Sequence, residues 1–219
     1  MIDAVVFDAY GTLFDVHSVA AHCERLWPNR GAAVSRTWRS KQLEYSWLRT
    51  LMGRYIDFET LTADALRWAC GSLGVPCGAA EIEQLLAAYR ELTVFPDVIA
   101  TLLGVGTRKR AILSNGSPAM LQAAVRNGGF EHMIDAVLSV DAVRVYKPDA
   151  RAYQLAVDTL HMDPARIGFV SANGWDVCGA RSFGFHTFWI NRSAAPSEHL
   201  SVEPDHALAA LTDLVRVLR

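Results

Sequence analysis

Short apolar runs in this sequence end in polar side chains. The polar residues at these ends carry carboxylate, hydroxyl or amide groups: Asp8, Ser114, Asn115, Ser171 and Asn173. Such groups donate and accept hydrogen bonds, so together they can hold and act on a small polar ligand. If the runs are strands of one parallel sheet, their carboxyl ends share the edge at which open α/β sheets bind ligands. The pattern therefore predicts a ligand-binding or catalytic site around Asp8.

Five apolar runs have the length expected of strands buried on both faces of a parallel sheet: residues 4–7, 111–113, 136–138, 167–170 and 187–190. Between them, Ser117 and Pro118 predict the start of a helix that ends near Asn127, and Asp149 predicts the cap of another that ends near His161. A C-terminal helix is predicted from an apolar face made of Leu208, Leu211, Leu214, Val215 and Leu218. Alternating strands and helices predict an α/β fold with a Rossmann-like parallel sheet.

The segment 15–95 differs because it carries helical patterns and no convincing strand. Helices are predicted in it over residues 34–54, 61–70 and 80–92. The α/β pattern begins before this segment and resumes near Pro96, so we expect a helical cap domain inserted after the first strand. The Rossmann-like core is then formed by residues 1–14 and 96–219.

Composition and charge exclude several functions. The net charge of the 219 residues is −2 and the basic residues are scattered, which argues against nucleic acid or a membrane surface as a partner. No segment approaches the roughly 20 apolar residues of a membrane span. The four cysteines form no CxxC pair. With no basic region before the first apolar run, we expect no signal peptide and a cytoplasmic location.

Four motifs occur in order along the chain. The segment 7–13, Phe-Asp-Ala-Tyr-Gly-Thr-Leu, resembles the first motif of the haloacid dehalogenase superfamily, in which the strand-end aspartate is the nucleophile. Ser114 matches the second motif and Lys147-Pro148 the third, and the segment 171–176 stands where the fourth, acidic motif belongs. One such motif alone is weak, but four in order at strand ends or helix starts are specific. The resemblance implies a HAD-like fold.

Most members of this superfamily are magnesium-dependent phosphatases, and two departures argue against that activity. Phosphatases carry a second aspartate two residues after the nucleophile as general acid and base, whereas Tyr10 stands here. A halide leaving group needs no proton, so it tolerates this loss. The fourth motif has Ser171 and Ala172 where the phosphatases supply acidic magnesium ligands, and only Asp176 remains acidic. We therefore expect neither a metal nor an organic cofactor.

The segments 8–10, 114–116 and 171–176, with residues 38–45 of the cap, resemble the L-2-haloacid dehalogenase branch. This resemblance implies hydrolysis of a short-chain L-2-haloacid to the inverted 2-hydroxy acid and halide. Asp8 attacks C2 of the substrate to form an ester, and water then hydrolyses the ester at the Asp8 carbonyl carbon. The resemblance also suggests a homodimer, formed through the cap helices.

The same resemblance implies residue roles. Lys147 keeps Asp8 ionised and is held by Tyr153, while Thr12 and Ser171 orient the Asp8 oxygens. Asn173 and Asp176 position or activate the hydrolytic water; whether Asp176 is a base or an anchor for Lys147 stays open. The residues expected at the substrate are Ala9, Tyr10, Arg39, Leu43, Phe58, Ser114, Asn115 and Trp175. Among them Ser114 and Asn115 precede a helix N-terminus that can hold the substrate carboxylate.

Arg39 is expected to receive the departing halide. Its helix also carries Arg36, Lys41, Arg49 and Arg54, and periodicity does not distinguish Arg39 from them; only the family pattern does. Two rival functions stay open. A phosphatase for a small phosphate ester would show magnesium-dependent hydrolysis that EDTA abolishes. A non-catalytic protein that binds small anions would bind without turnover, and the Asp8→Asn change would leave that binding unchanged.

Overall fold

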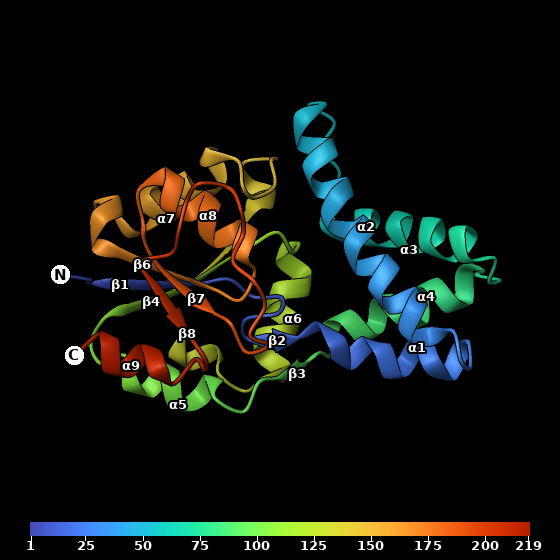
Figure 1. The fold of residues 1–219 in the computed structure, drawn as a ribbon, viewed down its shortest axis with the longest axis horizontal. Helices are drawn as coiled ribbons and strands as arrows, with labels where there is room; N and C mark the ends of the chain where they lie inside the picture. Colours follow the sequence, from blue (N-terminus) through green and yellow to red (C-terminus); the bar gives the residue numbers. More distant parts are fainter.

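The computed structural model describes residues 1–219, and its centre is a six-stranded sheet in which every neighbouring pair is parallel (Figure 1). The strands lie in the order β5-β4-β1-β6-β7-β8. Their bounds are β1 Ala4–Phe7, β4 Lys109–Ser114, β5 Ala136–Ser139, β6 Ile167–Ser171, β7 His186–Ile190 and β8 His206–Leu208. All four residues of β1 are buried, as expected of a central strand covered on both faces.

The register of the central strands brings the polar strand ends together. Phe7 of β1 lies opposite Ile112 of β4 on one side and Val170 of β6 on the other. The chain leaves β1 at Asp8, β4 ends at Ser114, and β6 ends at Ser171. The three polar side chains therefore meet at the carboxyl edge of the sheet, as the sequence predicts.

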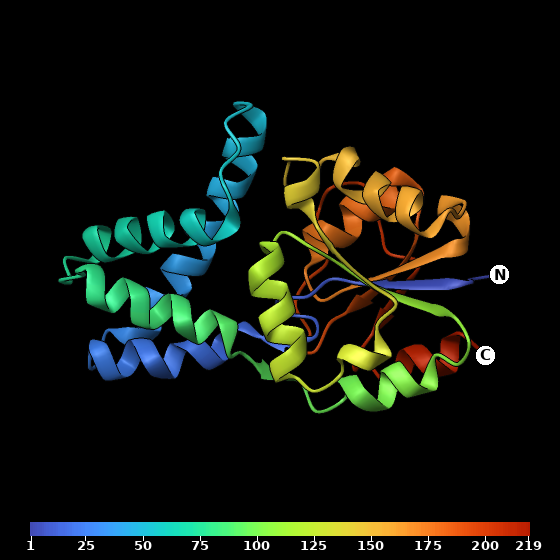
Figure 2. The same cartoon turned by 180° about the vertical axis from the view of Figure 1, so that it is seen from behind.

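Helices cover both faces of this sheet. In Figures 1 and 2, α7 and α8 lie on one face, whereas α5 and α9 lie on the other. The bounds are α5 Val98–Gly104, α6 Pro118–Asn127, α7 Ala150–Leu160, α8 Gly174–Phe183 and α9 Asp213–Val217. The two predicted caps are confirmed, because the side chain of Ser117 accepts from the N–H of Met120 and that of Asp149 accepts from Arg151.

Four further helices lie between β1 and β4 in the chain and stand together to one side of the sheet (Figure 2). They are α1 Ala20–Leu26, α2 Gly31–Leu51, α3 Phe58–Leu73 and α4 Ala79–Arg90, here called the helical insertion. The buried residues of α2 recur every three or four positions, at Gly31, Val34, Trp38, Gln42 and Ser46. Among the four helices of the insertion, α2 and α3 make the most extensive contact, and α2 also packs against α1.

The α/β fold with a Rossmann-like sheet is confirmed, and so are the five predicted strands, with bounds shifted by up to two residues. The predicted helices of the insertion start one to three residues earlier and end within three residues of the expected positions. The helix α1 has no counterpart among the predicted ones. None of the helices combines the length and the hydropathy that a membrane span requires.

Two expectations are wrong. The predicted C-terminal helix is shorter, covering only Asp213–Val217, and Leu208 belongs to the edge strand β8, where it pairs with Ile190. The segment 15–95 also contains strand residues, since β2 Phe14–Asp15 pairs antiparallel with β3 Thr93–Val94 where the chain enters and leaves the insertion. Strands of two or three residues are too short to show an alternating pattern, so the sequence does not reveal them.

Candidate active site

A tight turn after β1 places the first polar group of the site. The carbonyl of Ala9 accepts from the backbone N–H groups of Thr12, Leu13 and Phe14. Gly11 has φ +92°, a conformation that favours glycine. The turn carries Thr12 back toward Asp8, and its hydroxyl donates to Asp8 Oδ2 at 3.0 Å.

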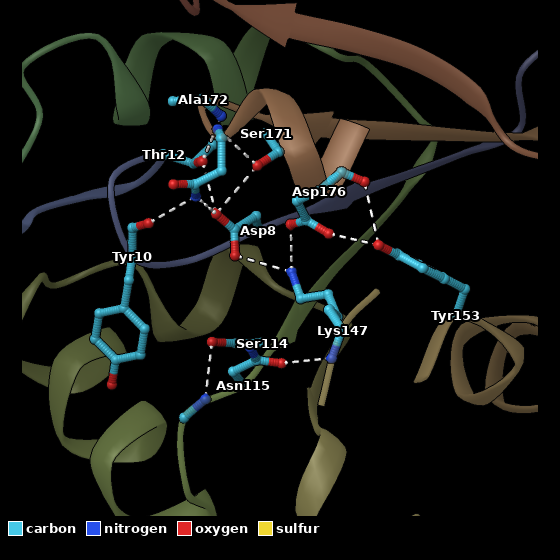
Figure 3. Close-up of polar contacts among 12 residues, drawn as sticks. Asp8, Tyr10, Thr12, Ser114, Asn115, Lys147, Tyr153, Ser171, Ala172 and Asp176 are labelled. Carbon is cyan, nitrogen blue, oxygen red and sulfur yellow. Dashed lines mark hydrogen bonds and ion pairs between the residues drawn. The ribbon is translucent and has the colours of Figure 1, made fainter. Parts of the chain in front are cut away.

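Three donors converge on one oxygen of Asp8 (Figure 3). Besides Thr12, the Ser171 hydroxyl lies 3.2 Å and the Asn173 amide 2.8 Å from Asp8 Oδ2. The direction of these bonds is fixed because a carboxylate oxygen only accepts. The Thr12 hydroxyl accepts from the Ala172 N–H and the Ser171 hydroxyl from the Asn173 N–H. Both hydroxyl hydrogens are therefore available for Asp8 Oδ2.

The other oxygen of Asp8 has one side-chain partner, the ammonium of Lys147. Lys147 Nζ lies 2.9 Å from Asp8 Oδ1 and 2.6 Å from Asp176 Oδ2. Its side chain is 1% exposed and that of Asp176 is 0% exposed. The backbone N–H of Lys147 also donates to Asn115 Oδ1 at 3.0 Å. Lys147 is thus fixed at both ends between two buried carboxylates.

Tyr153 supports Asp176 from the side away from Asp8 (Figure 3). Its hydroxyl donates to Asp176 Oδ1 at 2.8 Å. Burial raises the pKa of Tyr153 well above its ordinary value, so the hydroxyl keeps its proton. Tyr153 therefore reaches Lys147 through Asp176, not by direct contact.

The buried charges shift one another's protonation. Burial acts to lower the pKa of Lys147, but the carboxylates of Asp176 and Asp8 outweigh it and raise that pKa above the ordinary lysine value. Burial raises the pKa of Asp176 to about 6, although Lys147 and the Tyr153 hydrogen bond pull it down. Above about pH 6 Asp176 is therefore ionised beside the charged ammonium of Lys147.

A small cavity opens beside Asp8. Its lining residues come from strand ends and from the helical insertion: Asp8, Tyr10, Arg39, Leu43, Phe58, Ser114, Asn115, Lys147, Asn173 and Trp175. Tyr10 is 3% exposed and stacks on Phe58 at 5.9 Å between ring centroids. Aromatic and aliphatic groups thus wall one side of the cavity and keep bulk water from the carboxylate.

Arg39, on α2, is the positively charged residue of the cavity that lacks a carboxylate partner. Its Nη1 donates to Gln42 Oε1 at 2.7 Å, and no Asp or Glu lies within ion-pair distance of it. Lys147, in contrast, is shared by two carboxylates. An unpaired guanidinium facing a polar cavity attracts an anionic ligand.

No group of three or more His, Cys, Asp or Glu side chains is arranged to hold a metal ion. The carboxylates of Asp8 and Asp176 are the nearest approach to a ligand pair, and Lys147 Nζ occupies the space between them. The position two residues beyond Asp8, where a phosphatase has its acid and base, holds the buried ring of Tyr10.

Comparison with known proteins gives the family. The family model for haloacid dehalogenase-like hydrolases matches residues 2–184. The (S)-2-haloacid dehalogenase of Pseudomonas sp. (strain YL) is 47% identical over 218 residues, which cover 99% of this chain and 94% of that protein. The chain belongs to the L-2-haloacid dehalogenase branch of the haloacid dehalogenase-like hydrolases.

Solved structures of this dehalogenase branch have the same fold. The L-2-haloacid dehalogenase of Xanthobacter autotrophicus superposes with a TM-score of 0.95 at 45% identity, covering 100% of this chain and 99% of that one. A second structure of that enzyme, with chloropropionic acid covalently bound, matches with the same TM-score, identity and coverage. The HAD-like fold predicted from the motifs is confirmed.

In this dehalogenase the residues predicted for the site fall into two groups. Those that line the cavity are Asp8, Tyr10, Arg39, Leu43, Phe58, Ser114, Asn115, Lys147, Asn173 and Trp175. The others, Ala9, Thr12, Tyr153, Ser171 and Asp176, lie behind it and act on Asp8 or Lys147 through hydrogen bonds or through the backbone turn. Hydrogen bonds join Asp8 and Lys147 to Thr12, Asn115, Tyr153, Ser171, Asn173 and Asp176.

One side chain that contacts a predicted site residue is absent from the sequence prediction. Gln42 accepts the hydrogen bond of Arg39 and is itself 0% exposed. Its spacing of three residues from Arg39 is the available signal, since positions i and i+3 share one face of a helix. The sequence offers many such pairs on charged helices, so the spacing alone does not select this one.

Proposed function

We propose that this protein is a hydrolytic dehalogenase that converts short-chain L-2-haloacids to 2-hydroxy acids with inversion, through an ester on Asp8. The observation that supports this most directly is the unequal surroundings of the two Asp8 oxygens. Oδ2 accepts three hydrogen bonds, whereas Oδ1 has Lys147 as its one side-chain partner. Oδ1 is therefore the oxygen available to attack a ligand in the cavity.

In the first step Asp8 Oδ1 attacks C2 of the substrate from the side opposite the halogen. The C–O bond forms as the C–X bond breaks, and the halogen leaves with the bonding electrons as halide. We assign the halide to the Arg39 guanidinium, which has no carboxylate partner and can therefore stabilise a developing negative charge. Attack from the rear inverts C2.

The substrate carboxylate is assigned to the strand end at Ser114 and Asn115. The Ser114 hydroxyl accepts from the Gly116 N–H, which leaves its hydrogen free to donate to an anion. The Asn115 oxygen is occupied by the Lys147 N–H, so its amide nitrogen is the group available to a ligand. The loop leads into α6, whose N-terminus favours negative charge.

In the second step water attacks the carbonyl carbon of the Asp8 ester. Negative charge then develops on Oδ2, where Thr12, Ser171 and Asn173 already donate, so these three groups act as an oxyanion hole. The bond between the Asp8 carbonyl carbon and Oδ1 then breaks, so Oδ1 leaves with the product. Lys147, next to Oδ1, gives a proton to the departing alkoxide. The new carboxylic acid returns a proton to Lys147, and the proton lost by the water leaves the site.

Asp176 is assigned as the anchor of Lys147. Both of its oxygens are engaged, one by Lys147 and the other by Tyr153, and its side chain does not line the cavity. The reaction is proposed to need neither metal nor organic cofactor, because Lys147 supplies the positive charge between the two carboxylates.

We further propose that residues 15–95 form a cap domain over a core of residues 1–14 and 96–219, joined through the β2–β3 pair. A homodimer is supported by apolar side chains exposed near the end of α2, Leu51 at 82% and Met52 at 60%. Light scattering would then give twice the chain mass of 24.1 kDa. A cytoplasmic location is proposed because the four cysteines are free thiols, which are typical of a reducing compartment.

Halide release from L- and D-2-chloropropionate, with EDTA present, tests the proposal. We expect release from the L isomer alone and its loss in Asp8→Asn, which keeps the shape of the side chain but removes the nucleophile. Magnesium-dependent hydrolysis of a phosphate ester, without halide release from either isomer, would contradict it.

A further inference from the structure

A chain of buried polar side chains joins α2 to α3 behind the cavity. Arg39 donates to Gln42 Oε1 at 2.7 Å, and Gln42 Nε2 donates to the Thr62 hydroxyl at 2.7 Å. The Thr62 hydroxyl in turn donates to the Phe58 carbonyl at 2.6 Å. Gln42 and Thr62 are both 0% exposed. Buried polar side chains between two helices need such partners to be tolerated.

The order of donors and acceptors in this chain is fixed from one end. A guanidinium only donates, so the amide oxygen of Gln42 must face Arg39. The amide nitrogen must then point to Thr62, which accepts, and the remaining hydrogen of Thr62 goes to the Phe58 carbonyl. This series of hydrogen bonds therefore has a single arrangement of donors and acceptors. It ends at the carbonyl of Phe58, another residue that lines the cavity.

We infer that Gln42 and Thr62 are positioning residues that hold the Arg39 guanidinium where the halide leaves. This inference rests on the proposed dehalogenase function. Arginine has a long side chain with many rotamers, and Gln42 is the one side-chain acceptor that holds it here. A neutral acceptor fixes the guanidinium without cancelling its charge, whereas a carboxylate would neutralise it. The full charge is thus directed at the leaving group.

The test compares two leaving groups in single turnovers, with the enzyme in excess over substrate. Halide release from L-2-chloropropionate and L-2-bromopropionate is measured for the wild type, Gln42→Leu, Thr62→Val and Thr62→Ser. The leucine removes the acceptor at similar volume, the valine removes the hydroxyl at similar shape, and the serine restores it. Chloride, the poorer leaving group, depends more on electrostatic help than bromide does.

We expect Gln42→Leu to slow chloride release about ten- to a hundredfold, the effect of losing one hydrogen bond to a charged group. Bromide release falls less, so the chloride-to-bromide rate ratio falls. Thr62→Val lowers the ratio in the same direction, and Thr62→Ser restores it. Ser46→Ala is the matched control, because Ser46 is also 0% exposed on α2 but donates only to the Leu43 carbonyl of its own helix. It should leave the ratio unchanged.

Three results would overturn the inference. An equal fall for both halides in Gln42→Leu would mean that Gln42 only stabilises the fold. Unchanged release rates for both halides in folded Gln42→Leu, or in Thr62→Val if the leucine variant does not fold, would mean that Arg39 needs no such support. A wild type that releases no halide would instead remove the proposed function, and this inference with it.

Discussion

Replacing Tyr153 with phenylalanine should shift the pH dependence of the reaction without changing its maximum rate. Burial raises the pKa of Asp176 to about 6, and the hydroxyl of Tyr153 lowers that pKa by donating to the ionised carboxylate. Below this pKa Asp176 is protonated and no longer balances Lys147, whose charge then acts on Asp8 alone and weakens it as a nucleophile. Wild-type activity should therefore fall as the pH drops through about 6.

The size of the shift follows from one hydrogen bond. A hydrogen bond to a charged group contributes about 1.5–3 kcal/mol, and about 1.36 kcal/mol corresponds to one pH unit. Tyr153→Phe removes a donor to ionised Asp176, so protonation of Asp176 becomes easier. The acidic side of the pH–rate profile, here called the acid limb, therefore moves toward higher pH by about one to two pH units. Lys147 stays charged through this range, since its own pKa is raised above the ordinary value.

The assay is the rate of halide release in single turnovers from about pH 5 to pH 9.5 for wild type and variant. Tyr55→Phe is the control, because Tyr55 also donates to a carboxylate, that of Asp141 at 2.8 Å, but lies outside the cavity lining. Its acid limb should match the wild type. An unmoved limb in Tyr153→Phe, or a rate reduced equally at every pH, would refute the reasoning.

Three further predictions follow from the same geometry. Lys147→Met removes the buried cation between Asp8 and Asp176, so it should abolish turnover and lower the unfolding free energy by about 3–5 kcal/mol in urea titrations at neutral pH; an unchanged midpoint would contradict this. Trp175 lines both the active-site cavity and an outer cavity of about 580 Å³, so Trp175→Ala should raise kcat/KM for L-2-bromohexanoate relative to L-2-bromopropionate, and an unchanged ratio would show that the indole does not limit chain length. Dialysis against EDTA should leave the rate of halide release unchanged, and recovery of a lost rate by added magnesium would disprove the proposed metal independence.

The strand ends could be predicted from the sequence because at each of them an apolar run changes to polar residues. Asp8 and Ser171 come at the end of short apolar runs of the length expected of a strand buried on both faces. Once such strands are parallel, their ends meet at one edge, and the sheet register bears this out. The edge strand β8 escaped prediction because three residues show no period, and Leu208 and Leu211 happen to have helical spacing.

The polar contacts between distant segments could not be derived from local pattern. Tyr153 lies on α7 and its acceptor Asp176 on α8, so only the packing of the two helices brings them together. Arg39 shares its helix with several other basic residues, and the family motif alone selected it. Gln42 resembles an ordinary polar helix residue until the α2–α3 contact shows it to be buried.

Transfer of oxygen from solvent tests the central claim, that Asp8 forms an ester, most directly. Enzyme in excess over L-2-chloropropionate reacts once in ¹⁸O-water, and both the hydroxy acid and the peptide that contains Asp8 are analysed by mass spectrometry. We predict unlabelled lactate and one ¹⁸O in the Asp8 carboxylate, because the product takes its oxygen from Asp8 and water replaces it. Label found directly in the first-turnover lactate, with none in Asp8, would contradict the covalent mechanism.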